Sequence, residues 1–145
     1  MIDIDAVPTW VSRAILVILY LNKGEISKQK LTELLYLIYR ELKEVDPLED
    51  LDFYINMKTK RIEIFTPDKD VSINDILQFL FNDELINIYK DSIYLTEYGY
   101  RIVKELIKDP KFKDEIEVTI RIITQYKDMS EYDLINLILE NLKHS

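Results

Sequence analysis

Apolar residues recur every three or four positions along much of the chain, which is the spacing of one face of an α-helix. The first such stretch predicts a helix over residues 8–21, because Pro8 suits a first helical turn and the residues Asn22, Lys23 and Gly24 supply the stop. The apolar face predicted for this helix consists of Val11, Ile15, Ile18 and Leu19.

Two further helices are predicted from capping residues that precede helical apolar spacing. Ser27 is the predicted N-cap of the second helix, which Pro47 ends because proline cannot continue a helix. Its apolar stripe is Leu31, Leu34, Leu35, Ile38 and Leu42. Ser72 and Asp75 form a capping box at the start of the third helix, which ends near Asp83. The apolar positions of that helix are Ile73, Ile76, Leu77, Leu80 and Phe81.

Alternating apolar and polar residues predict two β-hairpins. In the first hairpin, "FYINM" and "RIEIF" flank a turn at Lys58, Thr59 and Lys60. In the second, "INIY" and "SIYL" flank a turn at Lys90 and Asp91. The second hairpin is predicted to direct Ile86, Ile88, Ile93 and Leu95 to one face, and Asn87, Tyr89 and Tyr94 to the other.

Thr96 ends the second hairpin and is the predicted N-cap of a fourth helix. Gly99 lies inside that helix, where glycine costs up to about 1 kcal/mol relative to alanine, so a close helix-to-strand contact is expected there. Two more helices are predicted over residues 111–126 and 131–143, the second capped by Ser130 with Asp133 at its third position. This order of elements predicts a mainly α (α+β) fold, with a winged helix-turn-helix domain over residues 1–109 and a two-helix C-terminal extension over residues 110–145.

Three stretches resemble phage-associated winged-helix proteins related to the Panacea antitoxin domain. They are "ILVILYLNKGEISKQKLTELLYLIYRE", "DILQFLFNDELI" and "IYLTEYGYRIVKEL", which together span about residues 14–106. The resemblance rests on the helix pair, the third helix and the "LT..G" exit from the second hairpin. It implies a winged-helix fold and an antitoxin-like regulatory role. The chain departs from such relatives at "FTPDKDVS", where they often carry a Gly-Pro-Tyr-Ser type stretch.

Composition and charge narrow the class of protein further. The 145 residues are 48% hydrophobic, which is enough for a core, and their formal net charge of −8 repels nucleic acid unless cations gather locally. Cysteine is absent, which excludes disulfides and thiolate chemistry.

The acidic start "MIDIDAV" does not fit a signal peptide, and the apolar run over residues 14–21 is too short to span a bilayer. A cytoplasmic protein without membrane association is therefore expected, and its wealth of Ile, Lys, Glu and Tyr resembles heat-adapted proteins.

The search for catalytic chemistry yields no candidate residues. The two glycines cannot build a phosphate-binding loop, and the single His144 lies beside the C-terminus, where a zinc site or catalytic triad would be frayed. The acidic residues between positions 44 and 52 lack the spacing of a calcium loop, so solvated charge is favoured over a metal site. The chain is therefore predicted to be non-enzymatic and to need no cofactor.

Nucleic-acid binding is the leading functional hypothesis. The third helix of a winged helix normally enters the major groove, and here it offers Asn74 and Gln78 as base-reading side chains but no basic residue. Phosphate contacts would have to come from other elements. The candidate DNA-binding residues are Lys28, Lys30, Lys58, Lys60, Arg61, Asn74, Gln78 and Lys90. The leading function is transcriptional regulation on double-stranded DNA, and the alternative is an acidic protein–protein interaction module without DNA binding.

The last two predicted helices carry more apolar surface than one packing contact needs. A homodimer would bury that surface and would present two winged helices to a palindromic DNA site. The alternative is that both helices wrap over their own domain. The candidate interface residues are Ile116, Ile120, Ile123, Leu134, Ile135, Ile138 and Leu142.

Overall fold

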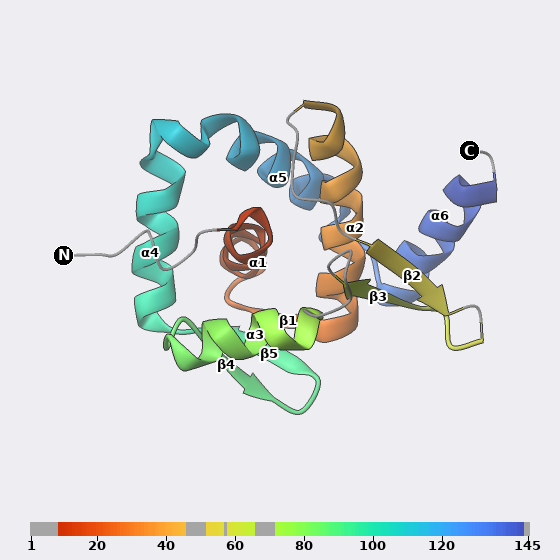
Figure 1. Cartoon of the computed structure of the whole chain (residues 1–145), viewed down its shortest axis with the longest axis horizontal. Helices are drawn as coiled ribbons and strands as arrows, with labels where there is room; N and C mark the ends of the chain where they lie inside the picture. Colours follow the sequence, from red (N-terminus) through yellow and green to blue (C-terminus); the bar gives the residue numbers. More distant parts are fainter. Residues whose placement is uncertain (1–8, 46–51, 57, 66–71, 144–145) are drawn as a thin grey trace.

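The computed structural model describes residues 9–45, 52–56, 58–65 and 72–143. Within these ranges the fold is mainly helical α+β, with six α-helices, an antiparallel three-stranded sheet and a separate two-stranded hairpin (Figure 1). The elements follow in the order α1 (Trp10–Leu21), β1 (Glu25–Ser27), α2 (Lys28–Val45), β2 (Asp52–Asn56), β3 (Arg61–Phe65), α3 (Ile73–Asn82), β4 (Ile86–Tyr89), β5 (Ser92–Leu95), α4 (Glu97–Lys108), the 3₁₀ turn η2 (Pro110–Phe112), α5 (Lys113–Tyr126) and α6 (Glu131–Lys143).

The helix α1 lies at the centre of the molecule, and Figure 1 looks nearly along its axis. The helices α2, α4 and α5 and the three-stranded sheet surround α1 and pack against it. Residues 10–19 are all buried, including the polar Ser12 and Arg13. A helix buried all round is typical of a protein core. The predicted apolar face is therefore only part of the buried surface, and its four members are all buried: Val11, Ile15, Ile18 and Leu19.

Side-chain caps begin five of the helices. Thr9 accepts a hydrogen bond from the backbone N–H of Ser12 (3.2 Å) at the start of α1. The predicted caps at Ser27, Ser72, Thr96 and Ser130 are confirmed, and the capping box predicted for α3 is present. Caps of this kind satisfy backbone N–H groups that have no partner within the helix. Some predictions concern residues outside the described ranges. These residues are Pro8, Pro47, His144 and most of the acidic stretch before Asp52.

The three-stranded sheet has the strand order β1-β5-β4. The second predicted hairpin is confirmed as β4 and β5, with Ile88 opposite Ile93. The strand β1 was not expected, because three residues are too few to display alternation. Its central residue Ile26 pairs with Ile93 and is buried. The backbone N–H of Lys28 then donates to the carbonyl of Asp91 (2.7 Å), which ties the start of α2 to the β4–β5 turn.

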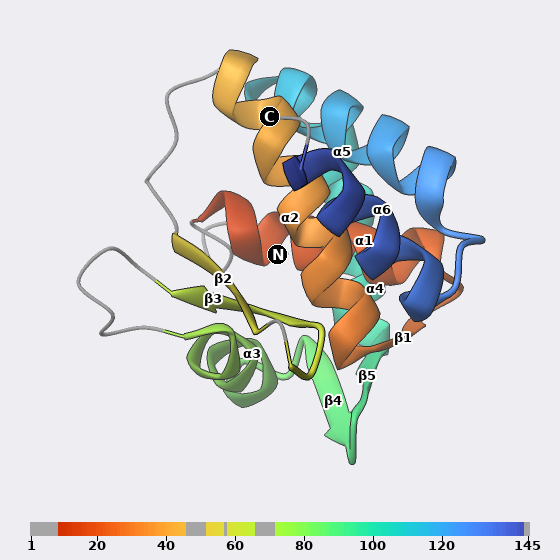
Figure 2. The same ribbon diagram turned by 90° about the vertical axis from the view of Figure 1, so that its right-hand side faces the viewer.

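The other hairpin, β2–β3, comes between α2 and α3 in sequence and packs against both helices (Figure 2). Its predicted turn is confirmed: the Asn56 side-chain oxygen accepts the backbone N–H groups of Lys58 (3.0 Å) and Thr59 (3.2 Å), and Lys60 has a positive φ of 55°. An asparagine that bonds to the following backbone in this way is a common turn signal. The tight turn places the side chains of Lys58, Lys60 and Arg61 in solvent.

Gly99 confirms the expected close contact between α4 and the sheet. A Cβ atom at this position would lie 2.3 Å from the Leu85 carbonyl oxygen and 2.6 Å from Cδ1 of Leu95. The adjacent cap residue Thr96 donates its hydroxyl to the Leu85 carbonyl (3.0 Å) and accepts the N–H of Gly99 (3.0 Å). Only a residue without a side chain fits between this cap and the strand.

The substitution Gly99→Ala is therefore expected to lower the free energy of unfolding by about 1–3 kcal/mol, the usual cost of overpacking. The steric cost outweighs the higher helix propensity of alanine, which is worth up to about 1 kcal/mol. Urea unfolding measures the change. Lys104→Ala, at an exposed position of the same helix, is the matched control and should stay within about 0.5 kcal/mol of the parent. A Gly99→Ala protein as stable as the parent would show that α4 can move away from Leu85 without loss.

The C-terminal helices pack on the rest of the chain. α5 packs against α1 and α2, and α6 packs against α2 (Figure 2). The start of α5 is Lys113 rather than the predicted 111, because Asp109 accepts the backbone N–H of Lys111 (2.9 Å) and caps a 3₁₀ turn. The prediction for α6 is confirmed at both ends.

A buried ion pair joins α5 to α1. Nε of Arg13 donates to one carboxylate oxygen of Glu115 and Nη2 donates to the other, both at 2.7 Å. The two side chains are only 10% and 14% exposed. The guanidinium also lies 4.3 Å from the centre of the Phe112 ring. Two-point pairing and stacking of this kind suit arginine at a buried site.

The predicted dimer-interface residues are mostly used inside the single chain. Ile120 is half-buried, and Leu142 remains exposed at the end of α6. The other five are fully buried against the chain's own core: Ile116, Ile123, Leu134, Ile135 and Ile138. Most of the apolar surface on which the homodimer prediction rested is therefore covered by the chain itself. The homodimer stays a prediction.

Candidate functional site

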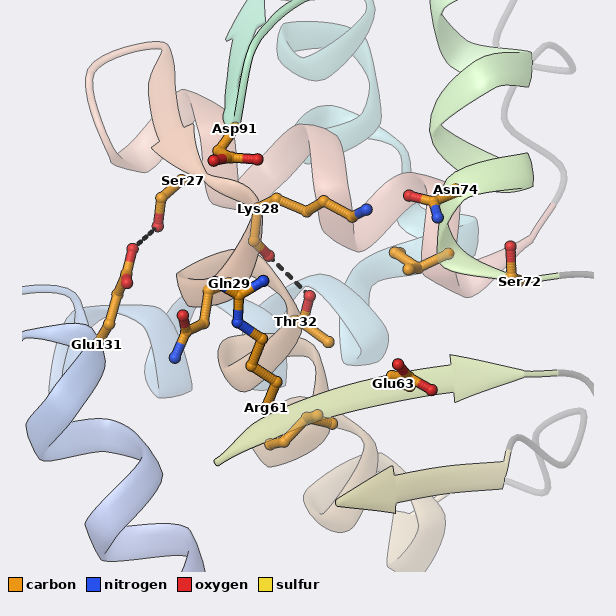
Figure 3. A pocket seen from close by; sticks show the side chains of 12 residues that line it. Ser27, Lys28, Gln29, Thr32, Arg61, Glu63, Ser72, Asn74, Asp91 and Glu131 are labelled. Carbon is orange, nitrogen blue, oxygen red and sulfur yellow. Dashed lines mark hydrogen bonds between the residues drawn. The ribbon is translucent and has the colours of Figure 1, made fainter. Parts of the chain in front are cut away.

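A polar pocket of about 500 Å³ lies where five elements meet (Figure 3). The N-terminal ends of α2, α3 and α6, the strand β3 and the β4–β5 turn all contribute to its walls. The residues that line it are Ser27, Lys28, Gln29, Thr32, Arg61, Ile62, Glu63, Ser72, Ile73, Asn74, Asp91 and Glu131.

Two side-chain hydrogen bonds shape one end of the pocket. Ser27 donates its hydroxyl to the carboxylate of Glu131, which links the start of α2 to the start of α6. Thr32 donates to the Lys28 carbonyl (2.7 Å) one turn into α2. Ile62 and Ile73 are buried and supply the apolar contact between β3 and α3 beneath the polar rim.

The charges in the pocket are mixed. Lys28 and Arg61 are its two cations, and Figure 3 shows the Lys28 side chain extending across the pocket toward Asn74. Three carboxylates also line it, those of Glu63, Asp91 and Glu131, and the last already accepts the Ser27 hydroxyl. A site of this kind can hold an anionic group between the two cations only where the carboxylates point away from it.

The pocket brings together three of the eight predicted DNA-binding residues: Lys28, Arg61 and Asn74. Lys60 and Lys90 each adjoin a lining residue in sequence, and Lys58 shares the β2–β3 turn with Lys60. We call Lys28, Lys58, Lys60 and Arg61 the basic edge.

Three predicted DNA-binding residues have other partners. The ammonium of Lys30 donates to the carbonyl of Lys127, between α5 and α6, so Lys30 faces the C-terminal helices and lies outside the basic edge. Gln78 is exposed on α3 and donates to the side-chain oxygen of Asn82 (3.0 Å). Lys90 is exposed, with its ammonium 5.4 Å from the centre of the Tyr89 ring.

The surface of α3 differs from its predicted pattern. Ile73, Leu77 and Leu80 are buried as predicted, but Phe81, which was predicted to join that apolar stripe, is largely exposed. Phe79 is more exposed still. At 100° per residue, these two phenylalanines fall on either flank of the buried stripe, and helical spacing could have shown this for Phe79.

Sequence reasoning also missed Glu33, a carboxyl group buried in α2. Burial raises the pKa of Glu33, the hydrogen bond from Gln29 (3.4 Å) lowers it in part, the negative charge of Glu131 raises it, and the positive charge of Lys30 lowers it. Together these effects move the pKa from 4.5 to about 8. Within the described part of the chain, one carboxyl oxygen of Glu33 has no hydrogen-bond partner. In the sequence, Glu33 looks like any polar residue of an amphipathic helix. Nothing in the local sequence indicates that another helix, α6, packs on α2.

Comparisons with known proteins find no family model, no curated protein and no solved structure that matches the chain. The resemblance to Panacea-related proteins therefore stays a prediction. Across the described ranges, no helix is both long and apolar enough to cross a membrane. The same ranges contain no cluster of three or more side chains suited to bind a metal ion.

Proposed function

We propose that this chain is a winged-helix domain with an inserted hairpin and a two-helix extension. The support is the element order α1, β1, α2, α3, β4 and β5, together with the sheet order β1-β5-β4. In a winged helix, α2 and α3 form the helix-turn-helix and the β4–β5 hairpin forms the wing. The β2–β3 hairpin then occupies the place of the usual turn between α2 and α3.

The function we propose is non-enzymatic regulation through contact with double-stranded DNA. The observation that carries this proposal is the convergence of Lys28, Arg61 and Asn74 on one pocket at the N-terminal ends of α2 and α3. In helix-turn-helix proteins, this end of the motif faces the duplex. The basic edge would contact phosphates, and Asn74 and Gln78 would face base edges. The resemblance to Panacea-related proteins adds an antitoxin-like role to this proposal.

A protein-interaction module without DNA binding is the second candidate. The observation that favours it is the charge of α3 and the turn after it, where Asp75, Asp83 and Glu84 are exposed and no cation is present. A recognition helix with this charge would be repelled by the phosphates that flank the major groove.

A duplex-binding assay at low salt tests the DNA proposal. Affinity should fall steeply as salt rises, and the variant Lys58→Ala/Lys60→Ala/Arg61→Ala should flatten the slope of log affinity against log salt by about 0.9 for each lost phosphate contact. The matched control is Lys104→Ala/Lys108→Ala/Lys113→Ala. It removes the same charge from exposed positions on α4 and the start of α5.

The control should keep the parent's salt dependence, because α4 lies on the opposite side of α1 from the β2–β3 hairpin (Figure 1). An equal loss of slope in both variants would mean that net charge, and not the basic edge, governs binding. No binding to a random duplex pool at low salt would reject DNA contact and leave the second candidate.

A further inference from the structure

The charged side chains that line the polar pocket do not pair with one another. The pocket holds two cations, Lys28 and Arg61, and two carboxylates, Glu63 and Asp91. Within the described part of the chain, none of these four side chains forms an ion pair or a hydrogen bond. The remaining carboxylate, Glu131, already accepts a hydroxyl hydrogen bond. Two positive and two negative groups therefore line a space of about 500 Å³ without internal partners.

These four groups come from different walls of the pocket (Figure 3). The Lys28 side chain extends from the start of α2 toward Asn74 on α3, and the Arg61 side chain reaches from β3 toward the start of α2. Glu63 lies on β3 and Asp91 lies in the β4–β5 turn. The fold thus brings the four charges together from three separate segments of the chain.

Side chains, and not helix ends, provide the charge of this site. Ser27 accepts the backbone N–H of Lys30 (3.2 Å), and Ser72 accepts the backbone N–H of Asp75 (3.4 Å). These caps already use N–H groups that an anion bound at the start of a helix would need. Recognition of a ligand in the pocket must therefore depend on the four unpaired side chains.

The mixture of charges decides which kind of ligand fits the pocket. An anion would pair with the two cations but would be repelled by Glu63 and Asp91, and a cation would be repelled by Lys28 and Arg61. A small molecule with one negative and one positive group pairs with both sets. The pocket volume lies within the range of about 300–1,000 Å³ that is usual for small-molecule sites.

We propose that this pocket binds a small zwitterion of the α-amino acid class. The carboxylate of the ligand lies between Lys28 and Arg61, and its ammonium group lies toward Glu63 and Asp91. The Asn74 amide, which offers both a donor and an acceptor, adds a hydrogen bond. Binding of the ligand does not require DNA. One consequence rests on the proposed function: a bound amino acid competes with DNA phosphates for Lys28 and Arg61.

The test titrates the full-length chain, without DNA, with each standard L-amino acid and follows the backbone NMR signals. At least one amino acid should bind saturably and shift the signals at the starts of α2 and α3. Its N-acetyl derivative lacks the ammonium group and its amide derivative lacks the carboxylate, so each should bind at least about tenfold more weakly. No saturable binding, signal shifts confined to other elements, or a derivative that binds as well as the amino acid would overturn the proposal.

Neutral variants of the cations test the carboxylate position. Lys28→Gln/Arg61→Gln should weaken binding of the amino acid at least about tenfold. The matched control is Lys104→Gln/Lys108→Gln, which removes two exposed cations from α4 and should bind like the parent. Equal affinities of these two variants would show that the pocket cations do not hold the ligand.

A variant of the carboxylates guards against a loss that comes only from misfolding. Glu63→Gln/Asp91→Asn changes two exposed side chains and should weaken the amino acid but strengthen the N-acetyl derivative, because the repulsion of that anion is removed. Misfolding cannot produce such a gain. Unchanged affinity for both compounds would overturn the assignment of the ammonium group.

Duplex binding is measured separately from the titration. A saturating concentration of the amino acid should weaken the affinity of the parent for a duplex at low salt. A duplex affinity that the bound amino acid does not change would overturn the competition. A chain that binds the amino acid but no duplex would refute the proposed function and keep this site, so the two failures can be told apart.

Discussion

Replacing Glu115 by alanine is expected to lower the free energy of unfolding by about 3–5 kcal/mol. The reason is that Arg13 would keep its positive charge inside the molecule without the carboxylate that now pairs with it at two points. Loss of one member of a buried pair costs more than the pair itself is worth, because the other charge stays desolvated. Urea or thermal unfolding of the purified variant measures the change.

A second ion pair on α5 provides the control. Arg121 of α5 lies 3.3 Å from Glu41 of α2, and the two side chains are 59% and 44% exposed. Glu41→Ala should therefore cost less than about 1 kcal/mol. The double variant Arg13→Met/Glu115→Leu removes both buried charges and should be more stable than Glu115→Ala. If Glu115→Ala and Glu41→Ala cost the same, the Arg13 pair contributes no more than a surface contact.

The variant Glu33→Gln is expected to become progressively more stable than the parent as pH rises toward about 8. Glu33 holds its proton in the folded protein up to a pKa of about 8, while in the unfolded chain it releases the proton near 4.5. Between these values the folded state binds one more proton than the unfolded state. The parent therefore loses stability with rising pH, at up to about 1.4 kcal/mol per pH unit from this group, and the loss levels off above the folded pKa.

Glutamine has nearly the shape of the neutral acid and does not titrate, so the difference between variant and parent isolates Glu33. Denaturant unfolding at several pH values between 4.5 and about 8 should show that difference growing steadily. Glu117→Gln, which changes an exposed carboxylate on α5, should show no such growth. A difference that does not vary with pH would mean that Glu33 is ionised in the folded protein at neutral pH, with water or a lysine as its partner.

The features that could be predicted from the sequence are those set by neighbours along the chain. Ser72, Thr96 and Ser130 each bond to a backbone N–H three residues ahead, so the local sequence alone predicts the helix starts. The β2–β3 turn depends on the Asn56 side chain and the two residues after it. Such contacts can be predicted without knowing the rest of the fold.

The features that were missed depend on contacts between distant residues. The strand β1 forms because its residues pair with β5, and Ile26 lies opposite Ile93, 67 positions later, in an antiparallel register. Glu33 is buried because the start of α6 lies near it, and the charge of Glu131 acts on it from there. The two exposed phenylalanines of α3 have no covering element in the described chain, which hydrophobicity alone does not reveal.

The candidate site could be predicted only in part, because it also depends on contacts between distant residues. Lys28 and Arg61 were chosen as cations, and the fold brings them to one pocket with Asn74. Lys30 lies only two positions from Lys28, but on a helix that spacing turns the side chain toward another face, where its ammonium donates a hydrogen bond to the carbonyl of Lys127. Their charge was enough to name both lysines as candidates. Only the packing of the C-terminal helices shows that Lys28 lines the pocket and Lys30 does not.

The covering of α1 has a consequence for the order in which the molecule forms during synthesis. α1 ends at Leu21, yet its neighbours α4 and α5 begin only at Glu97 and Lys113. Its partner in the buried ion pair, Glu115, follows Arg13 by 102 positions. Much of the apolar surface of α1 must therefore remain without its final cover until α4 and α5 have left the ribosome, and the native core closes late.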